Sequence, residues 1–404
     1  MSQSPLHFDE ARAVVLSETR AVRPAPPSEM VPLEQAGGRV LAADVAADRD
    51  YPPFPRAARD GFAVRSADIA DPPARLRVIG ETRAGEPSRF HVGPGEAVEI
   101  MTGAPAPPGA DCVVMVERTR REGDLVAVEE ALPSGRNIVP QGSESPASAV
   151  VLRGGLRLEY PQIALLAAVG RSEVPVFRRP RVAILSTGDE VVDVERTPEP
   201  FQIRNSNAWS LAAQLRRRGA QPLILPVAPD RLDKTRDLIS RGLEADLLLL
   251  SGGVSMGKHD LVERALAELG AEFFFTGVRI QPGKPLVFGR VGEKLFFGLP
   301  GNPVSTMVTF EVFARIAVDL LAGRSESPLP FLEARLATEF RHKPVLTRFL
   351  PARLEGAYDE VRVAPVEWQG SGDLAAVAAA HCFLVARHDR ESWAAGERIS
   401  ILPR

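Results

Sequence analysis

Four short segments carry the residue types that can bind an oxyanion or a phosphate. Residues 187–190 read Thr-Gly-Asp-Glu, and residues 252–253 are glycines, which let the main chain approach a phosphate closely. Residues 282–285 (Pro-Gly-Lys-Pro) hold Lys284 on a stiff turn between two expected strands. Residues 302–305 (Asn-Pro-Val-Ser) are typical of a helix start, whose free N–H groups favour an anion.

Carboxylates accompany these donors. Glu190 ends the first segment, and Asp260 follows the glycine pair. Because a carboxylate cannot bind an oxyanion directly, the mixture implies Mg²⁺ between the two sets of oxygens. We therefore expect a phosphoryl-type or oxyanion-transfer site. Taken singly, each segment keeps an ordinary alternative: a helix cap at Asp260, a solvated hairpin at Lys284, or a well-capped helix after Asn302.

Two catalytic motifs overlap the glycine pair, and neither is complete. Residues 253–257 match the G-x-S-x-G turn of hydrolases around Ser255, but two residues separate this turn from the strand, and the helix starts only near Asp260. Residues 252–258 match a Walker loop, but His259 stands where a magnesium-binding Ser or Thr is needed. We reject both interpretations.

The four segments lie in a region where strands and helices alternate. Over residues 180–325, apolar runs typical of strands alternate with helical runs, which predicts a parallel sheet with helices on both faces. Ligands of such sheets bind beyond the carboxyl ends of the strands. Residues 187–190, 252–253 and 302–305 fall at those ends, so they should surround one crevice.

The flanking regions have a different pattern. Residues 8–20 read as an amphipathic helix, whereas residues 60–141 and 330–404 show short strands and turns, which predicts small β modules. Residues 142–178 contain an expected helix at 161–169 and resume the style of the N-terminal part. We therefore expect the first β module to be an insertion.

The composition excludes several classes of protein. The chain of 404 residues has 49 basic and 52 acidic side chains, so it lacks the basic excess of a nucleic-acid-binding protein. The longest uncharged apolar stretch, residues 374–386, is too short to span a bilayer, and residues 1–10 lack the pattern of a signal peptide. Two cysteines without a C-x-x-C motif fit a reducing compartment. We expect a cytoplasmic enzyme with neither membrane nor nucleic-acid partners.

The motifs, taken in order, resemble those of the molybdopterin molybdenumtransferase family, which includes MoeA and the gephyrin E domain. Residues 53–63 (PFPRAARDGFA) and 100–105 (IMTGAP) come first. STGDE, SGGVSMGKHD, PGKP and GLPGNPVS follow, and the likeness covers essentially the whole chain. Molybdopterin adenylyltransferases share the α/β domain, and the first two motifs separate the two families.

The resemblance implies a multidomain α/β protein with four domains. Residues 1–50 and 142–178 would form an N-terminal α+β domain for linkage and dimerisation, and residues 51–141 an inserted β domain. Residues 179–326 would form a MogA-like molybdopterin-binding domain with a parallel-type sheet, and residues 327–404 a C-terminal β domain. It also implies a homodimer whose active site is shared between subunits.

The reaction implied by the resemblance inserts molybdate into adenylylated molybdopterin. Mg²⁺ assists hydrolysis of the adenylate, and AMP and molybdenum cofactor are released. The resemblance further implies contacts with a molybdopterin adenylyltransferase and with recipient molybdoenzymes. Two alternatives stay open: a molybdopterin adenylyltransferase that uses ATP, and a non-catalytic molybdopterin-binding scaffold.

Functional residues carry over from the family motifs by position. The implied catalytic residues are Asp60, Glu190, Asp230 and Asp260, and Glu190 and Asp260 are also the implied metal ligands. The implied substrate-binding residues are Thr102, Thr187, Gly188, Gly252, Gly253, Ser255, Lys284, Pro300, Pro303, Ser305, Arg348 and Ser371. The chain departs from the family at Gln281, where many members have lysine, and at residues 139–141, which replace a run of arginines.

Overall fold

The computed structural model describes residues 4–22, 26–253, 261–326 and 328–404, and the chain divides into two compact units. Unit 1 comprises Met1–Ala42, Gly155–Glu159 and Val174–Arg404, and unit 2 comprises Ala43–Gly154 and Tyr160–Glu173. The finer four-domain boundaries stay a prediction. In the described part of the chain, no helix has the length and apolar character needed to cross a membrane.

Unit 1 is built on a six-stranded sheet in the order β16-β13-β17-β21-β20-β18. The strands are β13 (Arg181–Ser186), β16 (Gln221–Ile224), β17 (Leu247–Ser251), β18 (Glu272–Phe275), β20 (Val287–Val291) and β21 (Lys294–Leu299). The first four in spatial order are parallel, but β20 is antiparallel to both its neighbours. The prediction of a parallel sheet is therefore corrected to a mixed one. The turn at residues 292–293 is too short for the crossover that parallel strands require.

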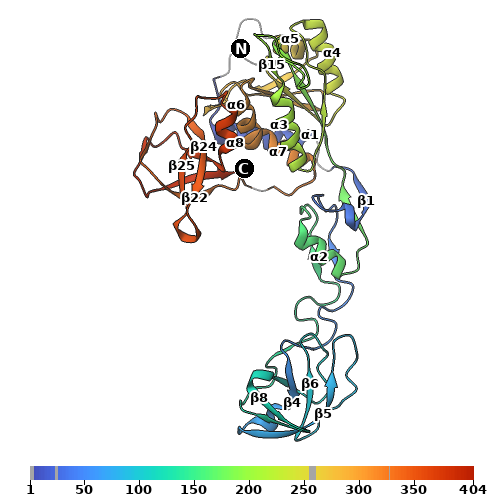
Figure 1. Cartoon of the computed structure of the whole chain (residues 1–404). Coiled ribbons are helices and arrows are strands. Elements are labelled where there is room, and N and C mark those ends of the chain that lie inside the picture. The colour runs from blue at the N-terminus through green and yellow to red at the C-terminus, as the bar shows by residue number, and fades with distance from the viewer. Residues whose placement is uncertain (1–3, 23–25, 254–260, 327) are drawn as a thin grey trace. The chain divides into compact units, whose positions relative to one another are not determined.

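Helices cover both faces of this sheet, as predicted (Figure 1). Val182 and Ile184 of β13 face a core formed with α1 (Phe8–Val22), α3 (Ser206–Arg217), α6 (Pro303–Thr309) and α7 (Arg315–Leu321). Ala183 and Leu185 face the other core, which α4 (Leu232–Gly242) and α5 (Leu261–Glu268) complete. The alternation follows from the strand repeat of two, and it explains why these strands are apolar throughout.

The C-terminal part of unit 1 is a second sheet that closes on itself. Its order is β19-β24-β25-β22-β28-β26, and β26 also pairs with β24. The strands are β19 (Ile280–Gln281), β22 (Leu332–Leu336), β24 (Thr347–Glu355), β25 (Arg362–Pro365), β26 (Cys382–Ala386) and β28 (Arg398–Pro403), with α8 (Leu374–Ala379) beside them. The β-rich C-terminal module predicted from sequence is confirmed, and it recruits β19 from an earlier part of the chain.

Unit 2 contains a third six-stranded sheet in the order β7-β4-β6-β5-β9-β8. The strands are β4 (Gly61–Val64), β5 (Ala74–Thr82), β6 (Glu96–Ile100), β7 (Cys112–Met115), β8 (Thr119–Glu122) and β9 (Leu125–Val128). Two-stranded ribbons join β3 (Arg56–Ala57) to β10 (Ile138–Val139) and β2 (Val45–Ala46) to β11 (Val150–Leu152), and α2 spans Tyr160–Ala168. A further ribbon pairs β1 (Ser28–Pro32) with β12 (Glu173–Phe177). This ribbon belongs to unit 1 except for Glu173, which is the last residue of unit 2.

Candidate active site

Three neighbouring strands of unit 1, β13, β17 and β21, end at the same level of the sheet. Ser186 pairs with Ser251, and Ser251 pairs with Leu299. The main chain continues this alignment into the loops, because Thr187 N donates to Ser251 O at 3.1 Å. The loops that contain residues 187–190, 252–253 and 300–305 therefore start from a common edge, as expected for a ligand site of an α/β sheet.

A cleft of about 1010 Å³ opens at this edge. It is lined by the strand-end loops, by the 282–285 turn and by parts of the C-terminal sheet. The predicted site residues that line it are Thr187, Gly188, Glu190, Asp230, Gly252, Gly253, Lys284, Pro300, Ser305, Arg348 and Ser371. The structure thus brings together most of the residues carried over from the family motifs.

Two glycines allow the loops to pack closely beneath the cleft. Gly188 has φ of +125°, and a Cβ built there would lie 2.3 Å from Glu190 Oε2. Gly253 has φ of +65°, and its Cβ would lie 2.7 Å from Thr187 Oγ1. Side chains rarely adopt either φ value, so both positions favour glycine; at Gly253 the neighbours also leave no room, whereas at Gly188 the exposed Glu190 carboxylate could move aside.

Two carboxylates, Glu190 and Asp230, line the cleft and are exposed. The neighbouring Asp189 has a different role, because its carboxylate accepts a hydrogen bond from Asp230 N at 3.0 Å and so ties two loops together. Within the described ranges no three His, Cys, Asp or Glu side chains form a metal-binding group. Glu190 and Asp230 nevertheless present the hard oxygen atoms that Mg²⁺ prefers, and Mg²⁺ is commonly held by one or two carboxylates together with substrate phosphates.

Lys284 lies in the cleft on a turn that connects two different sheets. Before the turn, Gln281 of β19 pairs with Arg348 in the C-terminal sheet, and after it β20 enters the mixed sheet. The Lys284 carbonyl accepts hydrogen bonds from Val278 N and Leu286 N, both at 3.0 Å. The hairpin alternative for this turn is therefore wrong, because its flanking strands do not pair with each other. The main chain holds the lysine at the junction between the two sheets.

Arg348 supplies a second cation on the same wall of the cleft. Burial lowers the pKa of its guanidinium, and Nε is buried without a hydrogen-bond partner among the described residues. A desolvated cation with an unpaired donor is stabilised by an incoming anion. Lys284 and Arg348 therefore make this wall suited to an oxyanion.

The loop at residues 300–305 is held to the C-terminal sheet by residue 371. Asn302 Nδ2 donates to Ser371 Oγ at 2.8 Å, and Val304 N donates to Ser371 O at 3.0 Å. Asn302 occupies the N-cap position without forming a side-chain cap, so the expected capping role is wrong. Pro303 is the first residue of α6 and does not line the cleft, whereas Ser305 is buried at its floor.

Sequence reasoning missed Asn207, which connects two loops of the site. Its Nδ2 donates to Ser251 Oγ at 2.9 Å and to Gly301 O at 2.7 Å. Two residues earlier, Asn205 caps α3 by accepting from Ala208 N at 3.1 Å. An Asn-Ser-Asn string is typical of a helix start, but no local pattern indicates which loops Asn207 contacts.

The remaining predicted residues lie elsewhere. Asp60 and Thr102 belong to unit 2, where Thr102 N and Oγ1 donate to Asp60 Oδ1 at 2.6 and 2.7 Å. These hydrogen bonds, from the hydroxyl first and the amide second, lower the pKa of Asp60. Ser255 and Asp260 lie outside the described residues.

Three family models match the chain. They are the MoeA N-terminal region (domain I and II) over residues 6–170, a probable molybdopterin binding domain over residues 183–320, and the MoeA C-terminal region (domain IV) over residues 333–403. Together they follow the order of the motifs along the chain.

Individual relatives are similar over most of their length. A molybdopterin molybdenumtransferase of Bacillus subtilis (strain 168) is 34% identical over 384 residues, which cover 93% of this chain and 89% of the relative. One from Nostoc sp. (strain PCC 7120) is 38% identical over 317 residues, which cover 76% and 73%. The solved structure of the molybdopterin biosynthesis moeA protein from Pyrococcus horikoshii OT3 is 29% identical with a TM-score of 0.81, and it covers 99% of this chain and 100% of that one.

Proposed function

The chain belongs to the molybdopterin molybdenumtransferase family, and from that premise we propose that its cleft inserts molybdate into adenylylated molybdopterin. It is an enzyme of molybdenum cofactor biosynthesis. In the proposed reaction the adenylate bond is hydrolysed, and AMP and molybdenum cofactor leave.

One observation carries this proposal. A single cleft of about 1010 Å³ contains two cationic side chains, glycine-rich loop amides and two carboxylates. The cations and amides suit molybdate and phosphate oxygens, whereas the carboxylates suit a divalent cation beside them. Adenylylated molybdopterin carries a pyrophosphate as well as the group that receives molybdenum. Its binding site therefore needs both anion-binding donors and carboxylates that can hold a divalent cation.

The residues of the chain divide these tasks by position. Lys284 and Arg348 lie on the wall shared by the two sheets, so we assign them to the molybdate and substrate oxyanions. The amides of the 187–190 and 252–253 loops approach the adenylate phosphate, since their glycines leave no side chain in the way. Ser305 contributes a hydroxyl from the floor of the cleft.

Glu190 and Asp230, with Asp260 from the family motif, are the residues we propose to hold Mg²⁺. When bound, Mg²⁺ would neutralise negative charge on the phosphate oxygens during hydrolysis. The exposed position of Glu190 and Asp230 in the cleft supports the assignment of these two residues.

We further propose a cytoplasmic homodimer in which Asp60 and Thr102 of one subunit complete the cleft of the other. Support comes from the family motifs that contain both residues and from the pair of hydrogen bonds that keep Asp60 ionised. At a molybdate concentration well below the KM of the Lys284→Ala variant, mixing Asp60→Ala subunits with Lys284→Ala subunits should give more activity than either variant alone, because one of the two sites in a mixed dimer is intact. Failure of the mixture to recover activity would contradict the shared site. Binding to a molybdopterin adenylyltransferase and to recipient molybdoenzymes belongs to the same proposal.

The central experiment measures AMP release from adenylylated molybdopterin with molybdate and Mg²⁺ present. Glu190→Gln should slow AMP release at least about tenfold with substrate still bound, because loss of a charged ligand removes on the order of 1.5–3 kcal/mol. Glu195→Gln is the matched control, since Glu195 is exposed and does not line the cleft. Equal slowing in both variants would refute the role given to Glu190.

The same assay separates the two alternatives. Pyrophosphate formed from ATP and molybdopterin would identify an adenylyltransferase instead. Tight binding of adenylylated molybdopterin without AMP release would identify a scaffold.

A further inference from the structure

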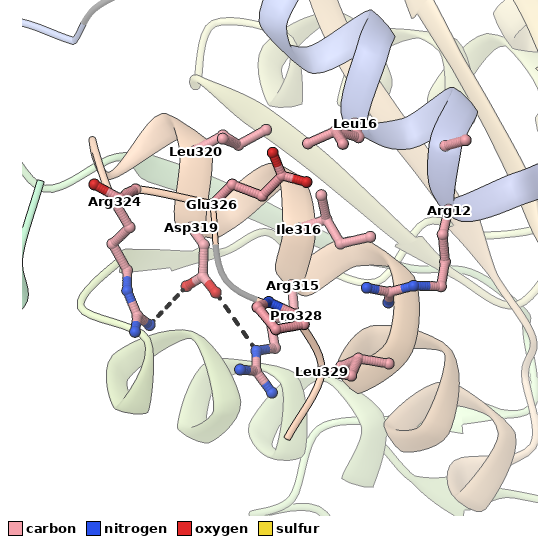
Figure 2. A pocket seen from close by; sticks show the side chains of 12 residues that line it. Arg12, Leu16, Arg315, Ile316, Asp319, Leu320, Arg324, Glu326, Pro328 and Leu329 are labelled. Carbon is pink, nitrogen blue, oxygen red and sulfur yellow. Dashed lines mark hydrogen bonds and ion pairs between the residues drawn. The ribbon is translucent and has the colours of Figure 1, made fainter. Parts of the chain in front are cut away.

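A second pocket lies between α1 and α7, away from the cleft described above. It has a volume of about 190 Å³, and arginines lie along its rim (Figure 2). We call it the arginine pocket and define it by Arg12, Leu16, Arg315, Ile316, Asp319 and Arg324. None of these residues lines the cleft, so the pocket needs an explanation of its own.

One carboxylate, Asp319, serves three guanidinium groups. Arg218 binds it through two hydrogen bonds, at 3.0 Å from Nε and 2.5 Å from Nη2. Arg324 Nη1 lies 3.1 Å from Asp319 Oδ1, and Arg315 Nε lies 3.4 Å from Asp319 Oδ2. The accepting capacity of Asp319 is therefore largely used, and none of it is directed to Arg12.

Arg12 has no carboxylate partner among the described residues. Its guanidinium donates to Val312 O and lies 5.6 Å from the centre of the Phe8 ring. Figure 2 shows Asp319 joined to Arg315 and Arg324, with Arg12 on the other side of the pocket. Burial, which is the largest effect, lowers the pKa of Arg12 to about 10; the attraction of Asp9, which raises this pKa, comes second, and the repulsion of Arg315, which lowers it, is the smallest of the three.

Positive charge exceeds negative charge around this pocket. The arginines are Arg12, Arg20, Arg218, Arg315 and Arg324, and the carboxylates are Asp9, Glu311, Asp319 and Glu326. Arg20 pairs with Glu326 and Arg315 Nη1 lies 3.9 Å from Glu311, whereas Arg218 and Arg324 share Asp319, so these carboxylates leave one guanidinium charge unbalanced. A partly desolvated cluster of guanidinium groups with one unbalanced charge is stabilised by an added anion.

We propose that the arginine pocket binds a small organic carboxylate between Arg12 and Arg315. Leu16, Ile316, Leu320 and Leu329 line the remaining wall and would contact the apolar body of such a ligand. A cavity of about 150 Å³ is enough for benzene, so 190 Å³ accommodates a compact ring or short chain beside the carboxylate. Inorganic phosphate would leave the apolar wall facing water, so it fits less well.

Calorimetric titration of the full-length protein with benzoate tests the proposal. Benzoate should saturate a single site, whereas benzamide, its neutral analogue, should bind at least about tenfold more weakly because it lacks the charge-assisted hydrogen bonds. Because the cleft is itself proposed to bind phosphate oxygens, phosphate is compared only through the part of its binding that Arg12→Gln removes, and this part should be weaker than the binding of benzoate. Absence of saturable benzoate binding, equal binding of benzamide, or tighter Arg12-dependent binding of phosphate would each overturn the proposal.

Two arginine variants locate the site. Arg12→Gln should weaken benzoate binding at least about tenfold. Arg290→Gln is the matched control, because Arg290 also lies over a phenylalanine ring, Phe274, at 5.7 Å but pairs with Glu272 outside the pocket. If Arg12→Gln fails to fold, Arg12→Lys keeps the charge but loses the planar fork, and it should bind benzoate with intermediate affinity. Unchanged benzoate affinity in the folded Arg12 variant would refute the assignment, and the transferase proposal would be unaffected because no molybdopterin is used.

Discussion

Replacing Gly253 by alanine should lower the free energy of unfolding of unit 1 by about 2–5 kcal/mol, because a backbone cost and a packing cost add at this residue. Its φ of +65° costs a residue with a Cβ about 1–2 kcal/mol. The added Cβ would also lie 2.6 Å from Val262 Cγ2 and 2.7 Å from Thr187 Oγ1, and overpacking of this kind costs about 1–3 kcal/mol.

Gly292 separates the two costs. It has a similar φ of +57°, it lies in the same unit, and a Cβ there would have no neighbour within 4 Å. Gly292→Ala should therefore show only the backbone cost, about 1–2 kcal/mol.

Urea unfolding followed by tryptophan fluorescence measures both variants. The three tryptophans of the chain, Trp209, Trp368 and Trp393, all belong to unit 1, so the signal reports on the unit that contains both glycines. Equal destabilisation by Gly253→Ala and Gly292→Ala would refute the close packing of the 252–253 loop against Thr187. If Thr187 moves to relieve the contact, kcat/KM should fall as well, because Thr187 lines the cleft.

Three further predictions concern single contacts. Lys284→Ala should raise the KM for molybdate about tenfold to a hundredfold through loss of a charged hydrogen bond, whereas Lys234→Ala, outside the cleft, should leave it unchanged. Thr102→Val should raise the pKa of Asp60, and an NMR titration of Asp60 would detect the change. The pKa of Asp60 is lowered in the folded protein, so the hydroxyl of Thr102 stabilises the fold above the ordinary pKa of aspartate. This stabilisation is lost as the pH falls through the lowered pKa. The aspartate in Asn207→Asp cannot donate a hydrogen bond to the Gly301 carbonyl, so this variant, like Asn207→Ala, should lower the free energy of unfolding by about 1–2 kcal/mol. Wild-type stability of Asn207→Asp would contradict the link that Asn207 makes between its helix and the loop at Gly301.

The helix that starts at the cleft also reaches the arginine pocket. α6 begins at Pro303, a π-helical turn spans Phe310–Ala314, and α7 then carries Arg315 and Asp319. π-helical turns within α-helices occur often at functional sites, because the extra residue changes which side chains face a neighbour. Here the turn lies between the two sites, and Val312 within it accepts the hydrogen bond of Arg12.

Local sequence patterns were enough to predict the loops of the site and the class of fold around them. Glycine, proline and strand-end polar residues act over a few positions, and the alternation of apolar runs with helical runs is equally local. For this reason the sequence alone predicts that residues 187–190, 252–253 and 302–305 lie at one edge of the sheet. The helices near residues 8–20 and 161–169 are confirmed for the same reason.

Which side chains contact one another depends on long-range packing and could not be predicted from local patterns. The antiparallel β20, the pairing of β19 with the C-terminal sheet, and the contact of Asn302 with Ser371 all depend on strands far apart in the chain. The hydrogen bond of Asn207 to Gly301 also joins distant parts of the chain. Asp189 binds a distant loop whereas its neighbour Glu190 lines the cleft, and this difference depends on the same long-range contacts. The register between distant strands determines where each side chain points. This register is selected by the free energy of burying the whole core, so it cannot be predicted from a few neighbouring residues.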